Sequence, residues 1–228
     1  MNPQEIYNWR KQLRRRLIEA RLALPGETLR AHREHIDSHL ERSFGKTVRG
    51  VVAFCWPYKN EYDVRGIAAA WRKRGVVTAL PVIAQPGSPL GFREWHPGIK
   101  LESGPLGIPY PVGSAEVIPD SVLLPMVGFD AKAYRLGYGG GYFDRTLASF
   151  VKRPLVIGLA YEILFLQTIH PLPHDMQVDY VVTERGRYRR SGGELRFEDG
   201  SGGGFSSPPC YASEIAPDYF GDSPARKS

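Results

Sequence analysis

The chain has 228 residues, of which 42% are hydrophobic and 24% are charged, and these values are typical of an ordinary globular protein. No segment approaches the roughly 18 consecutive apolar residues of a membrane-spanning helix, and the basic N-terminus lacks the apolar stretch of a secretory signal. The formal net charge of +6 favours anionic partners, and the two cysteines have no metal-binding or redox spacing. We therefore expect a cytoplasmic protein that does not associate with a membrane.

Apolar periodicity divides the chain into helices and strands. In the first segment Ile6, Trp9, Leu13 and Leu17 repeat at helical spacing, and Pro25-Gly26 ends the pattern. Helices and short apolar strands then alternate along the chain. The expected helices are 5–24, 27–44, 64–74 and a segment from about 142 to 150, and the expected strands are 48–56, 76–83, 91–95, 121–130, 155–161 and 178–184.

This alternation predicts the fold class. Continuous apolar strands such as SVLLPMVGFD are typical of strands that are buried on both faces. The sequence therefore predicts an α/β fold, with three α/β/α layers and a mainly parallel, Rossmann-like sheet. We expect one monomeric domain over residues 1–185. Residues 186–228 are rich in glycine, serine and proline, and we expect them to be a disordered tail.

A glycine-rich stretch between a predicted strand and a predicted helix is the most informative part of the sequence. RLGYGGGYFDR occupies residues 135–145. Glycine leaves the backbone N–H groups accessible, and a helix N-terminus adds the positive end of its dipole, so this junction can bind an anion. Arg135 can offer a planar guanidinium to phosphate oxygens, and Asp144 can offer a carboxylate to magnesium. The stretch therefore indicates a nucleotide site.

Three known phosphate-binding motifs do not match this stretch. A Walker A loop requires lysine followed by serine or threonine, which is missing after these glycines. A dinucleotide fingerprint would require glycine at Tyr142 or at Asp144, although Glu162 stands where a ribose-binding acid is expected. A kinase-type glycine loop joins two antiparallel strands, whereas this one precedes a helix.

The same stretch resembles the signature R-L-G-x-G-x-G-Y-Y-D-R of the 5-formyltetrahydrofolate cyclo-ligases, also called methenyltetrahydrofolate synthetases. Over about residues 9–184, other segments are similar to segments of that family in the same order: KQLRRRL, WPYKNEYDV, LLPMVGFD, PLVIGLAYE and HDMQVDYVVTE. The resemblance implies an enzyme that uses ATP and magnesium to close 5-formyltetrahydrofolate into 5,10-methenyltetrahydrofolate, with release of ADP and phosphate. Its partner is then a small folate and not a nucleic acid.

The resemblance also implies roles for individual residues. Arg135 and Arg145 are the implied catalytic residues, and Asp144 and Asp175 are the implied magnesium ligands. The implied ATP-binding residues lie in the first helix and the glycine loop: Arg10, Lys11, Arg14, Arg135, Leu136, Gly137, Tyr138, Gly139, Gly140, Gly141, Tyr142 and Phe143. The implied folate-binding residues are Trp56, Glu61, Tyr138 and Tyr142.

Some of the basic and aromatic residues have a structural interpretation beside the functional one. Arg15, Arg16 and Arg21 are expected on the solvated face of the first helix. Trp56 can equally pack in the core or stack on a pterin ring. A nucleic-acid interpretation of the basic helix lacks an aromatic platform or a known binding motif.

Two features of the sequence leave other functions open. Tyr110 stands where the resembled family has glutamate, in the segment GIPYP. This change leaves room for a nucleotide-binding paralogue without cyclo-ligase activity. Glu162 leaves room for a dinucleotide-dependent oxidoreductase.

Overall fold

The computed structural model describes residues 1–198, and its helices lie close to the expected positions. Helix α1 begins at a capping box, in which the Asn2 side chain accepts a hydrogen bond from the Glu5 amide and the Glu5 carboxylate accepts one from the Asn2 amide. The α-helices of the described part are α1 (Pro3–Leu22), α2 (Gly26–Phe44), α3 (Arg65–Arg72) and α4 (Tyr142–Ser149), with short 3-10 helices at Pro105–Gly107 and Glu162–Leu164.

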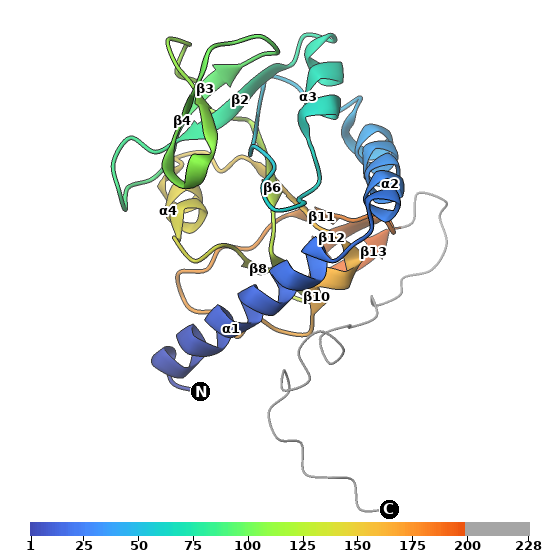
Figure 1. Cartoon of the computed structure of the whole chain (residues 1–228), viewed down its shortest axis with the longest axis vertical. Helices are drawn as coiled ribbons and strands as arrows, with labels where there is room; N and C mark the ends of the chain where they lie inside the picture. Colours follow the sequence, from blue (N-terminus) through green and yellow to red (C-terminus); the bar gives the residue numbers. More distant parts are fainter. Residues whose placement is uncertain (199–228) are drawn as a thin grey trace, which may run out of the picture.

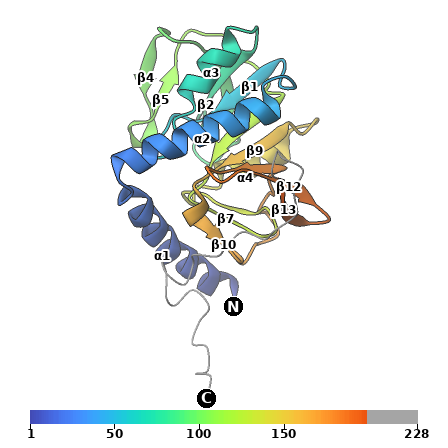
Figure 2. The same cartoon turned by 90° about the vertical axis from the view of Figure 1, so that its right-hand side faces the viewer.

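A large central sheet forms the core and confirms the predicted fold class. Its strand order is β13-β12-β11-β9-β6-β1-β2-β3. The five strands from β11 to β2 are parallel, and the strands at both edges are antiparallel. Helices α2 and α3 cover one face, and α4 covers the other (Figures 1 and 2). The strands are β1 (Val51–Phe54), β2 (Val77–Val82), β3 (Gly91–Trp95), β6 (Ser121–Pro125), β9 (Leu155–Leu159), β11 (Tyr180–Val182), β12 (Arg187–Ser191) and β13 (Glu194–Glu198).

A second, three-stranded sheet lies beside the central one and was not expected. It has the order β10-β7-β8, with β7 (Gly128–Asp130), β8 (Arg135–Leu136) and β10 (Phe165–Leu166). The predicted strand 121–130 is therefore two strands, because the Val127 amide leaves the central sheet to bond the Leu136 carbonyl. A hairpin of β4 (Leu101–Ser103) and β5 (Pro109–Pro111) completes the strands of the described part.

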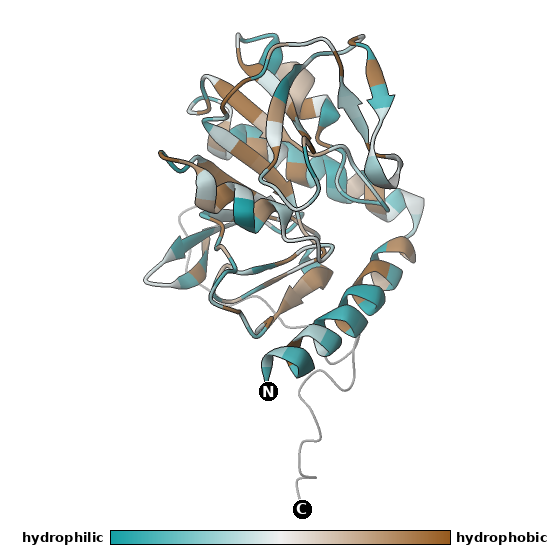
Figure 3. Cartoon of the chain, turned by 90° about the vertical axis from the view of Figure 1, so that its left-hand side faces the viewer, coloured by the Kyte–Doolittle hydropathy of each residue, from teal (hydrophilic) through white to brown (hydrophobic). Residues whose placement is uncertain are grey.

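Helix α1 packs on this small sheet and runs along one side of the molecule (Figure 1). A Cβ at Gly128 would lie 3.0 Å from the Leu17 side chain, so glycine permits the close approach of α1 to β7. Figure 3 shows apolar residues concentrated in the strands of the central sheet, whereas most of α1 is polar. In the described residues, no helix is both long enough and apolar enough to span a membrane.

The predicted domain boundary at residue 185 is wrong, because β12 and β13 extend the central sheet to Glu198. Charged and apolar residues alternate in β13, whereas β12 is polar apart from Tyr188, which is fully buried. A local signal was present: Gly192 and Gly193 both have positive φ and form a two-residue hairpin turn. Residues 199–228, the remainder of the predicted tail, lie outside the described part of the chain.

Candidate functional site

The glycine loop joins β8 to α4. It therefore follows a strand of the small sheet, and not directly the central strand as the sequence suggested. Gly139 (φ +99°) and Gly141 (φ +64°, the N-cap of α4) adopt the left-handed conformation that glycine tolerates best. Within the described residues, the amides from Gly137 to Gly141 donate to no acceptor. The loop thus presents consecutive unpaired donors beside a helix N-terminus.

Gly137 has no reason within the protein to be glycine. Its φ lies outside the left-handed region, and a Cβ built there would meet no atom of the described chain within 4 Å. By contrast, a Cβ at Gly140 would lie 2.9 Å from the Tyr142 ring. The space beside Gly137 is therefore available to a ligand that approaches the backbone.

Two arginines lie against the loop. The Arg14 Nε donates to the Gly137 carbonyl at 2.7 Å, and burial, followed by the nearby Arg10 charge, lowers the pKa of Arg14. Arg145 donates from a terminal nitrogen to the Gly140 carbonyl at 2.8 Å, and its Nε is buried without a partner in the described structure. A buried donor without a protein partner is free to donate to a water molecule or to a ligand.

Arg135 is buried between two neighbouring segments. One terminal nitrogen donates to the Met176 carbonyl, and the other donates to Asp144 Oδ1 at 2.8 Å. The Met176 amide also donates to Asp144 Oδ1, at 2.9 Å. Burial lowers the pKa of Arg135 and Asp144 opposes this effect, but an arginine stays charged in either case. In this structure Arg135 therefore fixes the carboxylate of Asp144.

Arg10 holds the loop that carries Asp175. Its guanidinium donates to the Ile169 and His170 carbonyls, and it pairs with both carboxylate oxygens of Asp175, at 3.2 Å and 2.6 Å. Burial opposes ionisation of Asp175, but hydrogen bonds from Arg10 and the Leu172 amide outweigh it, so the pKa of Asp175 lies below its ordinary value. Lys11, the neighbouring candidate for ATP, is exposed.

The two predicted magnesium ligands differ in how well they fit the ion. Asp144 has one oxygen engaged and one without a protein donor among the described residues, which suits an ion that also takes waters and phosphate oxygens. Both oxygens of Asp175 bond Arg10, so this carboxylate would have to leave that pair. The described residues contain no group of three or more potential metal ligands.

Glu61 lies at the carboxyl end of β1, in a second cluster beside the glycine loop. It is 8% exposed, and its two oxygens accept from the Tyr138 hydroxyl at 2.7 Å and from the Tyr58 amide at 3.0 Å. Burial raises the pKa of Glu61, and the Tyr138 hydrogen bond and the Arg21 charge act against this rise. The structure thus brings the predicted folate residues Glu61 and Tyr138 together.

Arg21 is the functional candidate that the sequence analysis missed. We expected a solvated side chain, but it is 1% exposed, whereas Arg15 is exposed as predicted. Its terminal nitrogens lie 2.7 Å from the Tyr138 hydroxyl and 3.8 Å from Glu61 Oε1. A signal for burial existed, because Arg21 is four residues beyond the buried Leu17 on the same helical face.

The remaining aromatic candidates are already partly covered by protein. The Arg65 guanidinium lies 4.6 Å from the Trp56 ring centroid, and Trp95 packs against Trp56 at 6.5 Å. Arg145 lies 5.1 Å from the centroid of Tyr142. A pterin contact by Trp56 or Tyr142 therefore stays a prediction.

Glu162 does not have the environment of a ribose-binding acid. It is buried and accepts from the Thr183 hydroxyl at 2.8 Å and from the Tyr188 hydroxyl at 2.6 Å. Both of its carboxylate oxygens are therefore bonded to residues in or next to β11 and β12. The one feature that favoured an oxidoreductase thus has a structural role.

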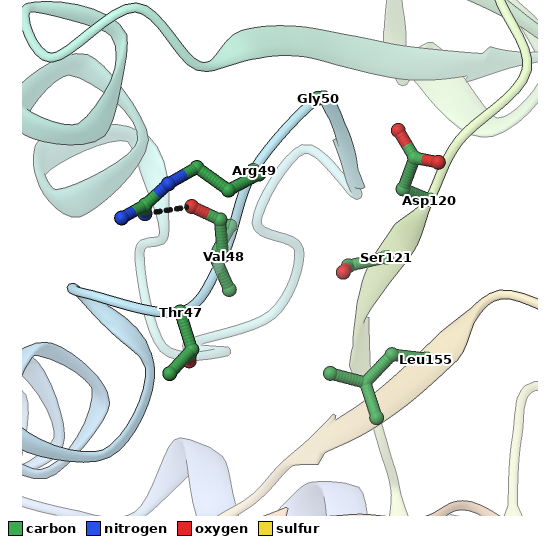
Figure 4. A pocket seen from close by; sticks show the side chains of 7 residues that line it. All are labelled: Thr47, Val48, Arg49, Gly50, Asp120, Ser121 and Leu155. Carbon is green, nitrogen blue, oxygen red and sulfur yellow. Dashed lines mark hydrogen bonds between the residues drawn. The ribbon is translucent and has the colours of Figure 1, made fainter.

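The structure also has a cavity of about 420 Å³ that none of these residues lines. Figure 4 shows the side chains around it. It is found at the amino ends of β1, β6 and β9, whereas the Glu61 cluster lies at the carboxyl ends of the parallel strands. Ligands of open α/β sheets bind at the carboxyl ends. The cavity is lined by Thr47, Val48, Arg49, Gly50, Asp120, Ser121 and Leu155.

Fold and site together define an α/β protein whose glycine loop presents amides without a protein acceptor in the described residues, and comparison with known proteins identifies its family. The model of the 5-formyltetrahydrofolate cyclo-ligase family matches residues 6–184. The chain is 27% identical over 186 residues to the 5-formyltetrahydrofolate cyclo-ligase of Mycolicibacterium smegmatis, covering 77% of this chain and 94% of that protein. It is 29% identical over 140 residues to the Escherichia coli K12 cyclo-ligase, covering 58% and 76%.

Solved structures agree with this result. The 5,10-methenyltetrahydrofolate synthetase of Aquifex aeolicus superimposes with a TM-score of 0.70 at 28% identity, covering 86% of this chain and 99% of that one. The synthetase of Mycoplasma pneumoniae has the same fold, with a TM-score of 0.63. This chain belongs to the 5-formyltetrahydrofolate cyclo-ligase family.

The Arg10–Asp175 pair predicts a pH-dependent contribution to stability. Because the pKa of Asp175 is lowered, its ionised form stabilises the fold above the unfolded-state value near 4, and this contribution is lost as the pH falls through the folded-state value. We expect Asp175→Asn to reduce the free energy of unfolding by about 2–3 kcal/mol at pH 7, because it removes the charged partner of the buried Arg10 guanidinium. The difference should shrink below about pH 4.

Urea unfolding of both proteins at pH 7 and at pH 3.5 measures this difference. Glu19→Gln is the matched control, because Glu19 forms an exposed ion pair with Arg15 at 3.8 Å, which should contribute little. An Asp175→Asn effect that is equal at both pH values would contradict the account of the pair.

Proposed function

We propose that this chain catalyses the ATP- and magnesium-dependent conversion of 5-formyltetrahydrofolate into 5,10-methenyltetrahydrofolate, with release of ADP and phosphate. Membership of the cyclo-ligase family supports the reaction. The observation that carries the nucleotide part is the glycine loop, whose amides donate to no described acceptor and whose Gly137 is glycine without an internal cause. A monomeric state and a cytoplasmic location stay predictions.

The loop amides and two arginines are proposed to bind the phosphates. Amides at the α4 N-terminus favour negative charge, and the unpaired Arg145 Nε can donate to a phosphate oxygen. Arg14 adds positive charge on the opposite side, beside Gly137 and Gly139. Tyr142 and Phe143 flank the loop and complete the proposed ATP-binding surface, whereas the side chain of the predicted ATP residue Leu136 is buried in the core.

Asp144 is the proposed magnesium ligand with the better fit. Asp144 would hold the magnesium ion, which would supply positive charge to neutralise the charge that develops on the phosphate oxygens. The task of the chain is to hold the Asp144 carboxylate in place, and Arg135 performs it together with the Met176 amide. Asp175 stays a candidate that is paired with Arg10 in this structure.

Of the two proposed catalytic arginines, Arg145 has the donor that can reach a ligand. Arg135 is buried and forms an ion pair with Asp144, so its positive charge can influence the phosphates through the position of that carboxylate. Positioned positive groups of this kind stabilise the charge of a transferring phosphoryl group, and they need not move during the reaction.

Glu61 is proposed to bind the pterin ring of the folate. A carboxylate offers about four acceptor positions, of which the Tyr138 hydroxyl and the Tyr58 amide occupy two. The remaining positions suit the neighbouring N–H groups of a pterin. Tyr138 belongs to the glycine loop, and its hydroxyl donates to Glu61. Its ring, which is 41% exposed, therefore lies between the proposed nucleotide and folate sides of the site.

The reaction can be followed by absorbance, because 5,10-methenyltetrahydrofolate absorbs in the near ultraviolet and the formyl substrate does not. We expect the absorbance to grow only when 5-formyltetrahydrofolate, ATP and magnesium are all present. Binding of ATP without any growth of the chromophore would favour the paralogue that has lost the activity. That outcome would agree with Tyr110, whose hydroxyl donates to Glu102 at 3.1 Å on the β4–β5 hairpin.

Substitutions of Gly137 and Gly139 distinguish a glycine that the ligand requires from a glycine that the fold requires. Gly137→Ala meets no atom and no strained φ, so we expect unchanged stability but ATP affinity that is lower by about tenfold or more, because the methyl group occupies the space of the phosphates. Gly139→Ala forces alanine to φ +99°, and we expect it to destabilise the fold by about 1–2 kcal/mol. Thermal unfolding and calorimetric titration with ATP measure both. Wild-type ATP affinity in Gly137→Ala would refute the proposed phosphate position.

A further inference from the structure

We propose that Arg21 is the positioning residue of the folate pocket, holding the Glu61 carboxylate and the Tyr138 hydroxyl in the arrangement that receives the pterin ring. This inference rests on the proposed function. Arg21 lies on α1, whereas Glu61 follows β1 and Tyr138 belongs to the glycine loop. The arginine is therefore the link among three separate parts of the chain.

The contacts of the guanidinium account for this role. The Arg21 Nε donates to the Lys59 carbonyl at 2.8 Å, one terminal nitrogen donates to the Met126 carbonyl at 3.3 Å, and the other donates to the Tyr138 hydroxyl at 2.7 Å. Arg21 is one of the largest fully buried side chains of the described residues. A lysine cannot reproduce this planar fork, since its donors radiate from one point.

The turn before Glu61, which the Glu61 amide closes on the Tyr58 carbonyl, has an unusual backbone conformation. Lys59 (φ +50°) and Asn60 (φ +57°) are consecutive non-glycine residues in the left-handed region, a conformation that L-residues rarely adopt. The carbonyl of Lys59 accepts from Arg21, and the amide of Tyr58 donates to Glu61. Two hydrogen bonds thus hold the strained turn: one from Arg21 to the Lys59 carbonyl, and one from the Tyr58 amide to the Glu61 carboxylate.

The charges around Glu61 also support a positioning role for Arg21. The groups that face Glu61 are Arg21 from α1, Tyr138 from the glycine loop, Cys55 at the end of β1 and Tyr161 after β9. Arg21 is the cation among them. Because burial already raises the pKa of Glu61, removal of the Arg21 charge should raise it further and leave the carboxyl protonated at a higher pH. A protonated carboxyl accepts fewer hydrogen bonds from a pterin.

Two substitutions in the full-length chain test the proposal. Arg21→Lys keeps the charge and loses the fork, and Arg21→Met loses both. We expect Arg21→Lys to weaken binding of 5-formyltetrahydrofolate about tenfold, measured by titration calorimetry without ATP, and to raise KM for folate while kcat stays within about threefold. For Arg21→Met, we expect the pH below which folate binding is lost to move upward by about one unit.

Arg190→Lys is the matched control. Its Nε donates to the Val178 carbonyl at 3.0 Å and a terminal nitrogen pairs with Asp179 at 3.1 Å, at an antiparallel edge of the sheet. It should leave folate affinity unchanged. Circular dichroism verifies that each variant is folded, and if Arg21→Met does not fold, the affinity and the KM–kcat split of Arg21→Lys decide alone.

Wild-type folate affinity in a folded Arg21→Lys variant, or a loss confined to kcat, would overturn the positioning role and leave the proposed function standing. Failure of the wild-type chain to bind 5-formyltetrahydrofolate would overturn both. These two outcomes are therefore distinguishable.

Discussion

The site depends on the desolvation of guanidinium groups along one face of α1. Arg10, Arg14 and Arg21 stand at i, i+4 and i+11, so helical geometry brings them to the same side. A guanidinium removed from water requires an acceptor for its donors, and here most of the acceptors are loop carbonyls and carboxylates. The helix therefore fixes the positions of loops that have little regular structure of their own.

Each arginine is tied to a different loop. Arg10 holds the segment that carries Asp175, Arg14 holds the glycine loop, and Arg21 holds the turn that precedes Glu61. The small sheet beneath α1 brings the glycine loop close to the carboxyl ends of the central strands. As a result, the glycine loop adjoins a buried carboxylate, and Tyr138 of the loop contacts both Arg21 and Glu61.

This arrangement fits a reaction in which the protein mainly positions two substrates. In the proposed reaction a phosphoryl group passes from a nucleotide to a folate, so both substrates would have to lie in line within one site. The amides, Arg14 and Arg145 offer positive groups on the nucleotide side. The folate side offers acceptors at Glu61. The chemical asymmetry of the two halves thus matches an anionic and a hydrogen-bond-donating ligand.

Local sequence patterns predicted the fold class and the candidate loop, because strand burial and glycine conformations depend on neighbouring residues. They failed where long-range contacts decide. The local sequence predicts that Arg21 is solvated, because the carbonyls of Lys59 and Met126 that accept its hydrogen bonds lie far away in the sequence. The sequence of β12 and β13 predicts a polar tail, because these strands have many charged residues and the burial of Tyr188 in β12 depends on distant parts of the chain.

Binding of nucleotide phosphates by the amides of the glycine loop can be observed by nuclear magnetic resonance of protein labelled with ¹⁵N-glycine. When magnesium and a non-hydrolysable ATP analogue are added, the amide signals of Gly137, Gly139, Gly140 and Gly141 should show the largest shifts. The signal of Gly50, in the cavity at the opposite end of the strands, should stay in place. Shifts at Gly50 with an unperturbed loop would contradict the account.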